Sequence, residues 1–454
     1  MRKALVNLET WMYATHRKPM VIRGARQVGK TWTVRQLAQI TGKKLIELNF
    51  ERRIHWRDLF TSNDPQEILL LLESELNQTI HPEQSLLFLD EIQAAPELLS
   101  KLRWFYEDMP ELAVIATGSL LEFTLADHEF SMPVGRIGYH YLEPFSFEEF
   151  LQALDKTKLC AFLQQWQWGQ TIPIPIHEQL MGYIKEYILI GGMPEAVVSW
   201  AEHRSLETVA EIQQALLTTY REDFAKYSGK IATEYLNDVL IAIPKLLGEK
   251  FIFSKVNKNI SSEPLKKALN LLCMARLCHK VSATYANGIP LGADVKENYF
   301  KMVLIDIGLG AAFLDLKLHQ LKSTDGFSLV NQGGISEQLV AQLLRTIEPN
   351  YKDPSLYYWL REEKGAQAEI DYLVQHEGRI IPIEVKSGST GSLKSLHYFM
   401  HLKNLSQAVR VNADVPSCVE VTTKIHSGDM VHYQLMSIPF YLVGQLHRLL
   451  KRHE

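Results

Sequence analysis

The sequence has few cysteines, no long apolar run and almost no net charge. Only four cysteines occur among 454 residues, too few for a disulfide framework, so we expect reduced thiols. No apolar run approaches the ~18 residues of a membrane span, so no helix is expected to cross a bilayer. The first residues carry Glu9 where a secretory signal has an apolar core. These absences together predict a cytoplasmic protein with no membrane partner.

The overall composition is that of a folded chain. Charged residues make up 22% and hydrophobic residues 46% of the sequence, which excludes a disordered chain. Lys and Arg number 48 against 52 Asp and Glu, a net charge of −4. This sum neither requires nor excludes a nucleic-acid partner, because it hides local patches. The length suggests two to four domains.

Short apolar runs alternate with helix-like patterns over residues 1–145. This alternation predicts an α/β fold with a parallel sheet covered by helices on both faces. The expected strands are Met20–Ile22, Lys44–Asn49, Ser85–Asp90, Leu112–Thr117 and Gly138–Leu142, and the expected helices are Thr31–Ile40, Gln66–Asn77 and Glu97–Asp108.

After residue 145 the pattern changes three times. Helical periodicity dominates residues 146–230, where we expect a helical lid. Residues 231–295 read as helix, turn, helix and strand, which suggests a winged-helix-like module. Residues 296–454 combine a helix with alternating strands, so a separate mixed α/β domain is expected there.

The segment Gly24-Ala-Arg-Gln-Val-Gly-Lys-Thr31 matches the phosphate-binding loop pattern G-x-x-x-x-G-K-[ST]. It follows a predicted strand and opens a predicted helix, which is the context the motif requires. Backbone N–H groups of such a loop cradle a polyphosphate, and the helix N-terminus adds partial positive charge. Lys30 is expected to reach the β and γ phosphates, and the Thr31 hydroxyl to ligate Mg²⁺. The cofactors predicted are therefore ATP and Mg²⁺, held by Gly24, Ala25, Arg26, Gln27, Val28, Gly29, Lys30 and Thr31.

Two carboxylates follow the apolar run Leu86–Leu89. Asp90 and Glu91 stand where this strand ends, at the sheet edge where ligands bind in parallel α/β folds. We expect Asp90 to hold Mg²⁺ through water and Glu91 to polarise the attacking water. This pair predicts hydrolysis as well as nucleotide binding.

The next strand ends in Thr117-Gly118-Ser119, and a hydroxyl there would sense the γ-phosphate. Thr117 and Ser119 are both candidates. An arginine is also expected to neutralise charge in the transition state. Arg136 and Arg221 are the candidates, and each has an alternative reading as a structural arginine.

These motifs occur in one order with Leu89-Asp-Glu-Ile-Gln93, Leu142-Glu-Pro-Phe-Ser-Phe-Glu-Glu-Phe150 and Gly191-Gly-Met-Pro194. That order resembles a group of prokaryotic AAA+-superfamily ATPases whose C-terminal domain is of unknown function. The resemblance implies an ATPase, and related ATPases often act as rings in which an arginine reaches across subunits. Trp32 stands where this group has a small residue. We expect Trp32 to pack on the helix without damage to the loop, and we count it and Ser119 among the nucleotide-binding residues.

A second candidate site lies in the C-terminal block. Asp371 precedes a turn and the strand Ile380–Lys386, so a hairpin is expected to bring it opposite Glu384. Glu384 and Lys386 share a face, and Glu337 on the preceding helix adds an acid. This set resembles the core of PD-(D/E)xK nucleases, in which carboxylates hold Mg²⁺ and a lysine positions the attacking water. The expected metal ligands are Glu337, Asp371 and Glu384. The alternative is an ordinary half-exposed hairpin, since Glu-x-Lys is a common pair.

Residues 245–280 are locally basic. The stretch contains eight Lys or Arg residues and two Glu residues, so its local net charge is 8 − 2 = +6. Such a stretch predicts salt-dependent contacts with DNA phosphates, and the alternative is a solvated helical face.

Two functions follow from these expectations. One is an ATPase that couples its nucleotide cycle to a DNA-directed, nuclease-like module. The other is a regulatory ATPase switch whose nuclease-like domain is inactive and binds a protein partner.

Overall fold

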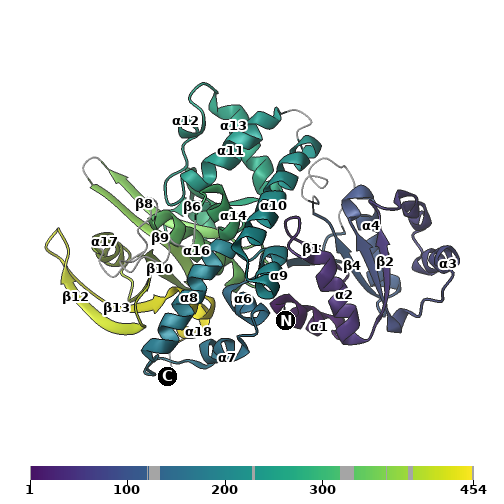
Figure 1. Cartoon of the computed structure of the whole chain (residues 1–454), viewed down its shortest axis with the longest axis horizontal. Helices are drawn as coiled ribbons and strands as arrows, with labels where there is room; N and C mark the ends of the chain where they lie inside the picture. The colour runs from purple at the N-terminus through teal and green to yellow at the C-terminus, as the bar shows by residue number, and fades with distance from the viewer. Residues whose placement is uncertain are drawn as a thin grey trace. The chain divides into compact units, whose positions relative to one another are not determined.

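The computed structural model describes residues 2–119, 121, 133–227, 231–316, 332–363, 366–386 and 392–451. The chain divides into two compact units (Figure 1). The first unit comprises Met1–Glu143 together with the short segments Met274–Arg276 and Pro349–Asp353. The second unit comprises Pro144–Cys273, Leu277–Glu348 and Pro354–Glu454.

The first unit is built on a parallel sheet of strand order β2-β3-β4-β1-β5. Strand β3, between β2 and β4, is buried along its whole length, as expected for a strand covered on both faces. The parallel sheet predicted from the sequence is confirmed. The strands are β1 (Met20–Arg23), β2 (Lys44–Asn49), β3 (Ser85–Asp90), β4 (Ala113–Thr117) and β5 (Gly138–Tyr141).

Helices cover both faces of this sheet. Helices α3 and α4 pack with one set of alternating strand residues, which includes Leu87 and Val114. Helix α2 contacts β2, β3 and β4 outside that cluster, so it lies on the other face. The helices are α1 (Lys3–Met12), α2 (Lys30–Thr41), α3 (Pro65–Leu76) and α4 (Leu98–Asp108).

The second unit contains an eight-stranded mixed sheet of order β12-β13-β11-β10-β9-β8-β6-β7. Strand β6, expected as part of a small module at 231–295, pairs with β7 on one edge and β8 on the other. Residues on both sides of position 295 therefore share one sheet, and the winged-helix-like module stays a prediction. The strands are β6 (Cys278–Thr284), β7 (Val295–Leu304), β8 (Leu356–Glu363), β9 (Ala366–His376), β10 (Arg379–Val385), β11 (Gln407–Asn412), β12 (Ser417–Lys424) and β13 (Met430–Pro439).

Two helices cover opposite faces of this sheet. Leu373 of β9 belongs to the apolar cluster of α17, whereas its neighbour Tyr372 donates its hydroxyl to the Glu337 carbonyl of α16. No helix in the described ranges is long and apolar enough to cross a membrane. The helices of this unit are α6 (Phe147–Ala153), α7 (Thr157–Gln165), α8 (Ile174–Ile190), α9 (Pro194–His203), α10 (Leu206–Tyr227), α11 (Thr233–Lys245), α12 (Phe253–Val256), α13 (Ser262–Met274), α14 (Ile307–Phe313), α16 (Gln332–Ile347), α17 (Lys394–Lys403) and α18 (Leu446–Leu449).

A buried carboxylate fixes the Gly191-Gly192 turn within the second unit. Asp306 is fully buried at the N-cap of α14 and accepts hydrogen bonds from Gly192 N (2.6 Å), Leu309 N (3.1 Å) and Gln342 Nε2 (3.0 Å). A Cβ on Gly191 would lie 2.0 Å from the Asp306 carboxylate, so only glycine fits there. The glycine pair singled out in the sequence therefore has a packing role.

Candidate functional site

The loop between β1 and α2 has the backbone that a phosphate-binding loop requires. Gly29 caps α2 in the left-handed region (φ 90°), and Gln27 is also left-handed (φ 68°). A Cβ on Gly24 would lie 2.5 Å from the Leu142 carbonyl oxygen. Glycine at both ends of the motif thus permits a tight turn that directs N–H groups toward a ligand.

Neighbouring groups fix the side chains of Lys30 and Thr31 at the start of α2 through hydrogen bonds. Lys30 is buried, and its ammonium donates to the carbonyls of Gly24 (2.9 Å) and Ala25 (2.8 Å). The Thr31 hydroxyl donates to Asp90, with its oxygen 3.2 Å and 3.3 Å from the two carboxylate oxygens. The loop lysine, the loop threonine and the β3 carboxylate therefore lie together at this edge of the sheet.

Asp90 is the hub of this edge of the sheet. Besides Thr31, the Thr117 hydroxyl (2.5 Å) and the Asn49 amide (3.1 Å) donate to its carboxylate. Burial raises the pKa of Asp90, and the hydrogen bonds from Thr117, Asn49 and Thr31 oppose that rise. Asn49 was missed in the sequence, although its place at the end of a predicted parallel strand puts it at the same edge as Asp90.

Glu91 follows Asp90 in a left-handed conformation (φ 54°), which turns the chain sharply at the end of β3. The Gln93 amide donates to the Glu91 carboxylate (2.6 Å). Gln93 also packs against the end of β4, because a Cβ on Gly118 would lie 2.5 Å from its amide oxygen. Gln93 therefore lies between the expected base and the strand end expected to sense phosphate.

Three further predicted residues differ in how they relate to the loop. Ser119 is buried after the end of β4. Trp32 is half exposed (50%) on the first turn of α2. Arg136 precedes β5, whose first residue Gly138 is paired with Met20 at the start of β1. The P-loop follows the other end of β1.

Arg136 therefore lies at the amino edge of the sheet, opposite the edge that carries the P-loop of its own chain. Its Nε contacts the Glu107 carboxylate at 3.0 Å. Arg221, the other candidate, lies on α10 of the second unit, with its guanidinium over the Phe313 ring.

In the second unit, β9 and β10 bring the predicted acids together. The antiparallel register runs to Ile383 opposite Tyr372, and one further step places Glu384 opposite Asp371. The Asp371 carboxylate accepts the Val385 N–H at 2.7 Å. The register between β8 and β9 shifts by one residue beside Asp371, and such bulges re-aim side chains at functional sites.

Glu384 has the features of a carboxylate that could coordinate a metal ion. It is 95% buried, and one oxygen contacts the Lys386 ammonium at 2.6 Å. Its other oxygen, Oε2, is buried without a hydrogen-bond partner. Burial and, second to it, the Asp371 charge raise the pKa of Glu384 to about 7 against the opposing effect of Lys386. Two carboxylates and an orphaned oxygen suit a hard cation.

A buried lysine that the sequence did not reveal lies beside this set. Lys301 of β7 is 1% exposed, and its ammonium contacts Glu337 (2.8 Å) and Glu369. Burial raises the pKa of Glu337 to about 8, and the Lys301 charge opposes the rise. Glu369 could have been predicted to lie near the site, because it precedes Asp371 by two residues on one strand and so shares its face. Nothing in the sequence indicates that Lys301 lies beside these acids.

Glu337, which was expected to bind a metal ion, therefore forms an ion pair with Lys301 instead. In the described part of the chain, no group of three or more His, Cys, Asp or Glu side chains is arranged to hold a metal ion.

The basic stretch 245–280 is less cationic at its surface than its residue count indicates. Lys250 pairs with Glu362, Lys255 with Glu249 and Lys267 with Glu263. Arg276 is buried in the first unit, where it pairs with Glu143 and Asp353. The expected +6 patch is thus partly neutralised by pairs that include acids outside the stretch, and DNA binding there stays a prediction.

Comparison with known families identifies the first unit. Residues 16–151 match a family described as an AAA domain, whereas residues 181–320 and 332–433 match two families described only as domains of unknown function (DUF8612 and DUF4143). A search of the curated proteins found no match. The sheet and P-loop of the first unit are those of an AAA+ ATPase-type domain.

Solved structures show weak likenesses, each at 14% identity. The Aeropyrum pernix Orc1 protein in complex with DNA has a TM-score of 0.26, with 69% of this chain and 91% of that chain covered. C. elegans PCH-2 has a TM-score of 0.26, with 46% and 65% covered. The Thermotoga maritima RuvB Holliday junction branch migration motor has a TM-score of 0.29, with 62% and 90% covered. Likenesses at these scores carry no functional argument.

Proposed function

We propose that this protein binds ATP with Mg²⁺ at residues 24–31, hydrolyses it through Glu91, and couples that cycle to a C-terminal, metal-dependent module that acts on DNA. One observation carries the ATPase part of the proposal. Lys30, Thr31, Asp90 and Glu91 converge at the carboxyl edge of a parallel sheet, with Thr31 bonded to Asp90.

The donor set at this edge fits Mg²⁺. The Thr31 hydroxyl and the Asp90 carboxylate are hard oxygen ligands within hydrogen-bond distance of each other. When bound, Mg²⁺ would supply positive charge at the β and γ phosphates. Lys30 exchanges its bonds to the loop carbonyls for phosphate oxygens, and Glu91 orients the attacking water.

Substitution of the expected base tests this part. Glu91→Gln removes the negative charge with little change in shape, so ATP should still bind while kcat falls about 10²-fold or more. Phosphate release measures turnover, and a fluorescent ATP analogue measures binding. Glu111→Gln, at an exposed acid of the same unit, is the matched control and should keep the parent rate. Hydrolysis at the parent rate by Glu91→Gln would show that the assignment of Glu91 is wrong.

The DNA-directed part is supported by Asp371, Glu384 and Lys386. The orphaned Glu384 oxygen and the neighbouring Asp371 are the ligands a hard cation would use, and the cation would supply Lewis acidity at a phosphodiester. Lys386, fixed against Glu384, positions the attacking water and stabilises negative charge that develops on the phosphate oxygens.

A switch with an inactive nuclease-like domain is the second candidate, and Lys301 favours it. Its buried ammonium already neutralises Glu337 and Glu369, so the acids beside Asp371 are satisfied by an internal cation. In that case the second unit would bind a protein partner and report the nucleotide state of the first.

A cleavage assay separates the two candidates. Plasmid and single-stranded DNA are incubated with the full chain in Mg²⁺ or Mn²⁺, alongside Asp371→Ala, Lys386→Ala and the control Lys394→Ala. Cleavage lost in the first two variants and kept in the control supports the nuclease. Cleavage that persists equally in all variants identifies a contaminant, and no cleavage by the parent favours the switch.

The position of Arg136 suggests action between chains. Since it lies at the sheet edge opposite its own P-loop, it would act on the nucleotide of a neighbouring copy in a homo-oligomer. Mixing Arg136→Ala with Lys30→Ala should then restore part of the ATPase activity that each variant lacks alone. Two inactive variants that remain inactive when mixed would contradict this role.

A further inference from the structure

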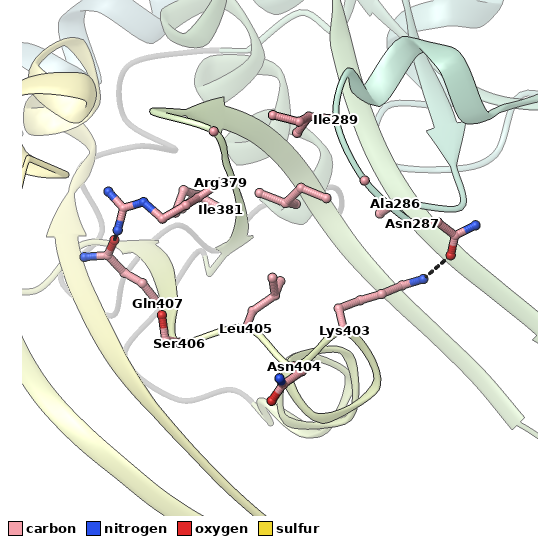
Figure 2. Close-up of a pocket in the computed structure, with 13 residues that line it drawn as sticks. Ala286, Asn287, Ile289, Arg379, Ile381, Lys403, Asn404, Leu405, Ser406 and Gln407 are labelled. Carbon is pink, nitrogen blue, oxygen red and sulfur yellow. Dashed lines mark hydrogen bonds between the residues drawn. The ribbon is translucent and has the colours of Figure 1, made fainter.

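The second unit contains a pocket that the proposed ATPase and nuclease chemistry does not use. Three segments form its walls (Figure 2): residues 286–289 after β6, residues 378–381 from the β9–β10 turn into β10, and residues 403–407 from the end of α17 to the start of β11. Its volume is about 390 Å³, within the roughly 300–1,000 Å³ of small-ligand sites. The pocket lies at the start of β10, whereas Glu384 lies near the end of that strand.

The charges that line this pocket are all positive. Its lining includes Arg379 and Lys403 and contains no Asp or Glu. The Lys403 ammonium donates to the Asn287 amide oxygen at 2.8 Å, and no carboxylate of the described residues lies within ion-pair distance of it. Burial lowers the pKa of Lys403, and the charge of Asp294, which accepts a hydrogen bond from the Asn287 amide, only partly offsets that shift, so the cation lacks a full counter-charge. An anionic group that enters the pocket would supply that charge.

The second cation is also incompletely neutralised. Arg379 donates to the Gln407 amide oxygen at 3.4 Å, and the nearest carboxylate is that of Glu377, 3.7 Å away and more than half exposed. A guanidinium with spare N–H groups is suited to phosphate, which it binds through two parallel hydrogen bonds.

The space between the two cations has a different chemistry. Figure 2 shows Arg379 and Lys403 on opposite sides of the pocket with Leu405 between them. Ile289 extends the apolar surface, and the rim carries the hydrogen-bonding side chains of Asn404 and Ser406. Cations at two sides, an apolar middle and polar rim groups match a ligand in which two phosphates flank a less polar centre.

We propose that this pocket binds a nucleotide unit that carries phosphate on both its 3′ and 5′ sides. The phosphates pair with Arg379 and Lys403, and the ribose that joins them, with its base, rests on the apolar surface around Leu405. Such a unit occurs as a free nucleoside bisphosphate and as one residue within a nucleic-acid strand. The inference does not depend on ATP hydrolysis by the first unit, because it rests only on groups of the second.

Two probes distinguish these sources. Calorimetry measures the binding of adenosine 3′,5′-bisphosphate, and fluorescence anisotropy measures the binding of a short labelled single-stranded oligonucleotide, both to the full chain in EDTA. Binding of the bisphosphate alone indicates a free nucleotide, and binding of the oligonucleotide indicates a strand. If the parent binds neither probe at millimolar concentration, the proposal fails.

Variants locate the binding. Arg379→Glu and Lys403→Glu should each weaken it about tenfold or more, because each replaces a charge-assisted hydrogen bond with repulsion. Gly288→Asp adds a carboxylate at the rim where a Cβ meets no atom within 4 Å, so it should weaken binding without disturbing the fold. If a reversal variant does not fold, Arg379→Gln or Lys403→Gln replaces it.

Two controls keep the result specific. Lys394→Glu reverses an exposed charge at the other end of α17 and should change affinity less than twofold. Lys30→Ala, which alters the P-loop, should leave binding unchanged. A loss in Lys394→Glu equal to that in Lys403→Glu would show nonspecific attraction and overturn the proposal. Loss in Lys30→Ala alone would assign the ligand to the P-loop and also overturn it.

Discussion

Replacement of Asp306 by alanine should destabilise the second unit strongly. Its carboxylate is fully buried and accepts three hydrogen bonds, from two backbone N–H groups and the amide of Gln342. Alanine leaves the N–H groups of Gly192 and Leu309 buried without an acceptor, whereas the Gln342 amide keeps the Tyr187 hydroxyl as an acceptor. Each unsatisfied donor costs about 1–3 kcal/mol, so the expected loss in the free energy of unfolding is at least about 2 kcal/mol.

Asparagine at the same position gives a graded comparison. Asp306→Asn keeps one acceptor oxygen, so about half of the alanine effect should remain. Burial raises the pKa of Asp306, which means that the charge itself is a cost that asparagine removes. The amide variant should consequently be the milder of the two.

The assay should report on the turn as well as on global unfolding. Urea denaturation followed by circular dichroism gives the free energy, and hydrogen exchange by mass spectrometry reports Gly192 and Leu309 directly. Glu202→Ala, at an exposed acid of the same unit, should change stability by less than about 0.5 kcal/mol. A loss below about 1 kcal/mol in Asp306→Ala, with unchanged exchange at both amides, would refute the reasoning.

Three further predictions follow from buried or restrained side chains. Burial and the Arg2 charge lower the pKa of His140 to about 4, so between pH 6.5 and 4 the unfolded chain binds a proton that the folded chain does not. From pH 7 to 5 the parent should lose about 2 kcal/mol more unfolding free energy than His140→Gln, and equal losses in urea titrations would contradict this. Gln93→Ala should lower kcat about tenfold with little change in the KM for ATP, because Glu91 loses its orienting hydrogen bond; an unchanged kcat in a phosphate-release assay would exclude that role. Lys301→Met should destabilise the second unit by about 3–5 kcal/mol by leaving buried carboxylates unpaired, whereas Lys296→Met on the same strand should have a small effect in the same denaturation assay.

The first unit could be predicted closely because its signals are local. The strand expected at 85–90 is β3 with the same bounds, and the loop at 24–31 joins β1 to α2 as its motif requires. Asp90 and Glu91 were placed correctly at a sheet edge because a buried parallel strand ends at a ligand site. What the sequence did not reveal there are the partners from neighbouring strands, such as Asn49, which depend on strand order.

The second unit was predicted less well because its sheet is assembled from distant segments. The hairpin of β9 and β10 was inferred from a local turn, and it places Glu384 opposite Asp371 as expected. Strand β6, by contrast, pairs with β8 across more than 70 residues, and no local pattern indicates such a pairing. A boundary drawn at residue 295 from the change in pattern therefore separates β6 from its neighbour β7 at one edge of a single sheet.

A count of charges along the sequence overestimates the free positive charge of residues 245–280 and misses the positive charge around the Arg379 and Lys403 pocket. The stretch 245–280 has a large positive sum, yet its cations are partly paired and one of them, Arg276, is buried with Glu143 and Asp353. The loops around the Arg379 and Lys403 pocket attract no attention in the sequence, because their two cations are separated by 24 positions. Folding pairs several cations of residues 245–280 with acids, and it brings Arg379 and Lys403 together around one pocket. Affinity for anionic ligands should therefore follow the cations that folding leaves with weak or incomplete acidic pairing, and the charge-reversal variants at Arg379, Lys403 and Lys394 measure that difference directly.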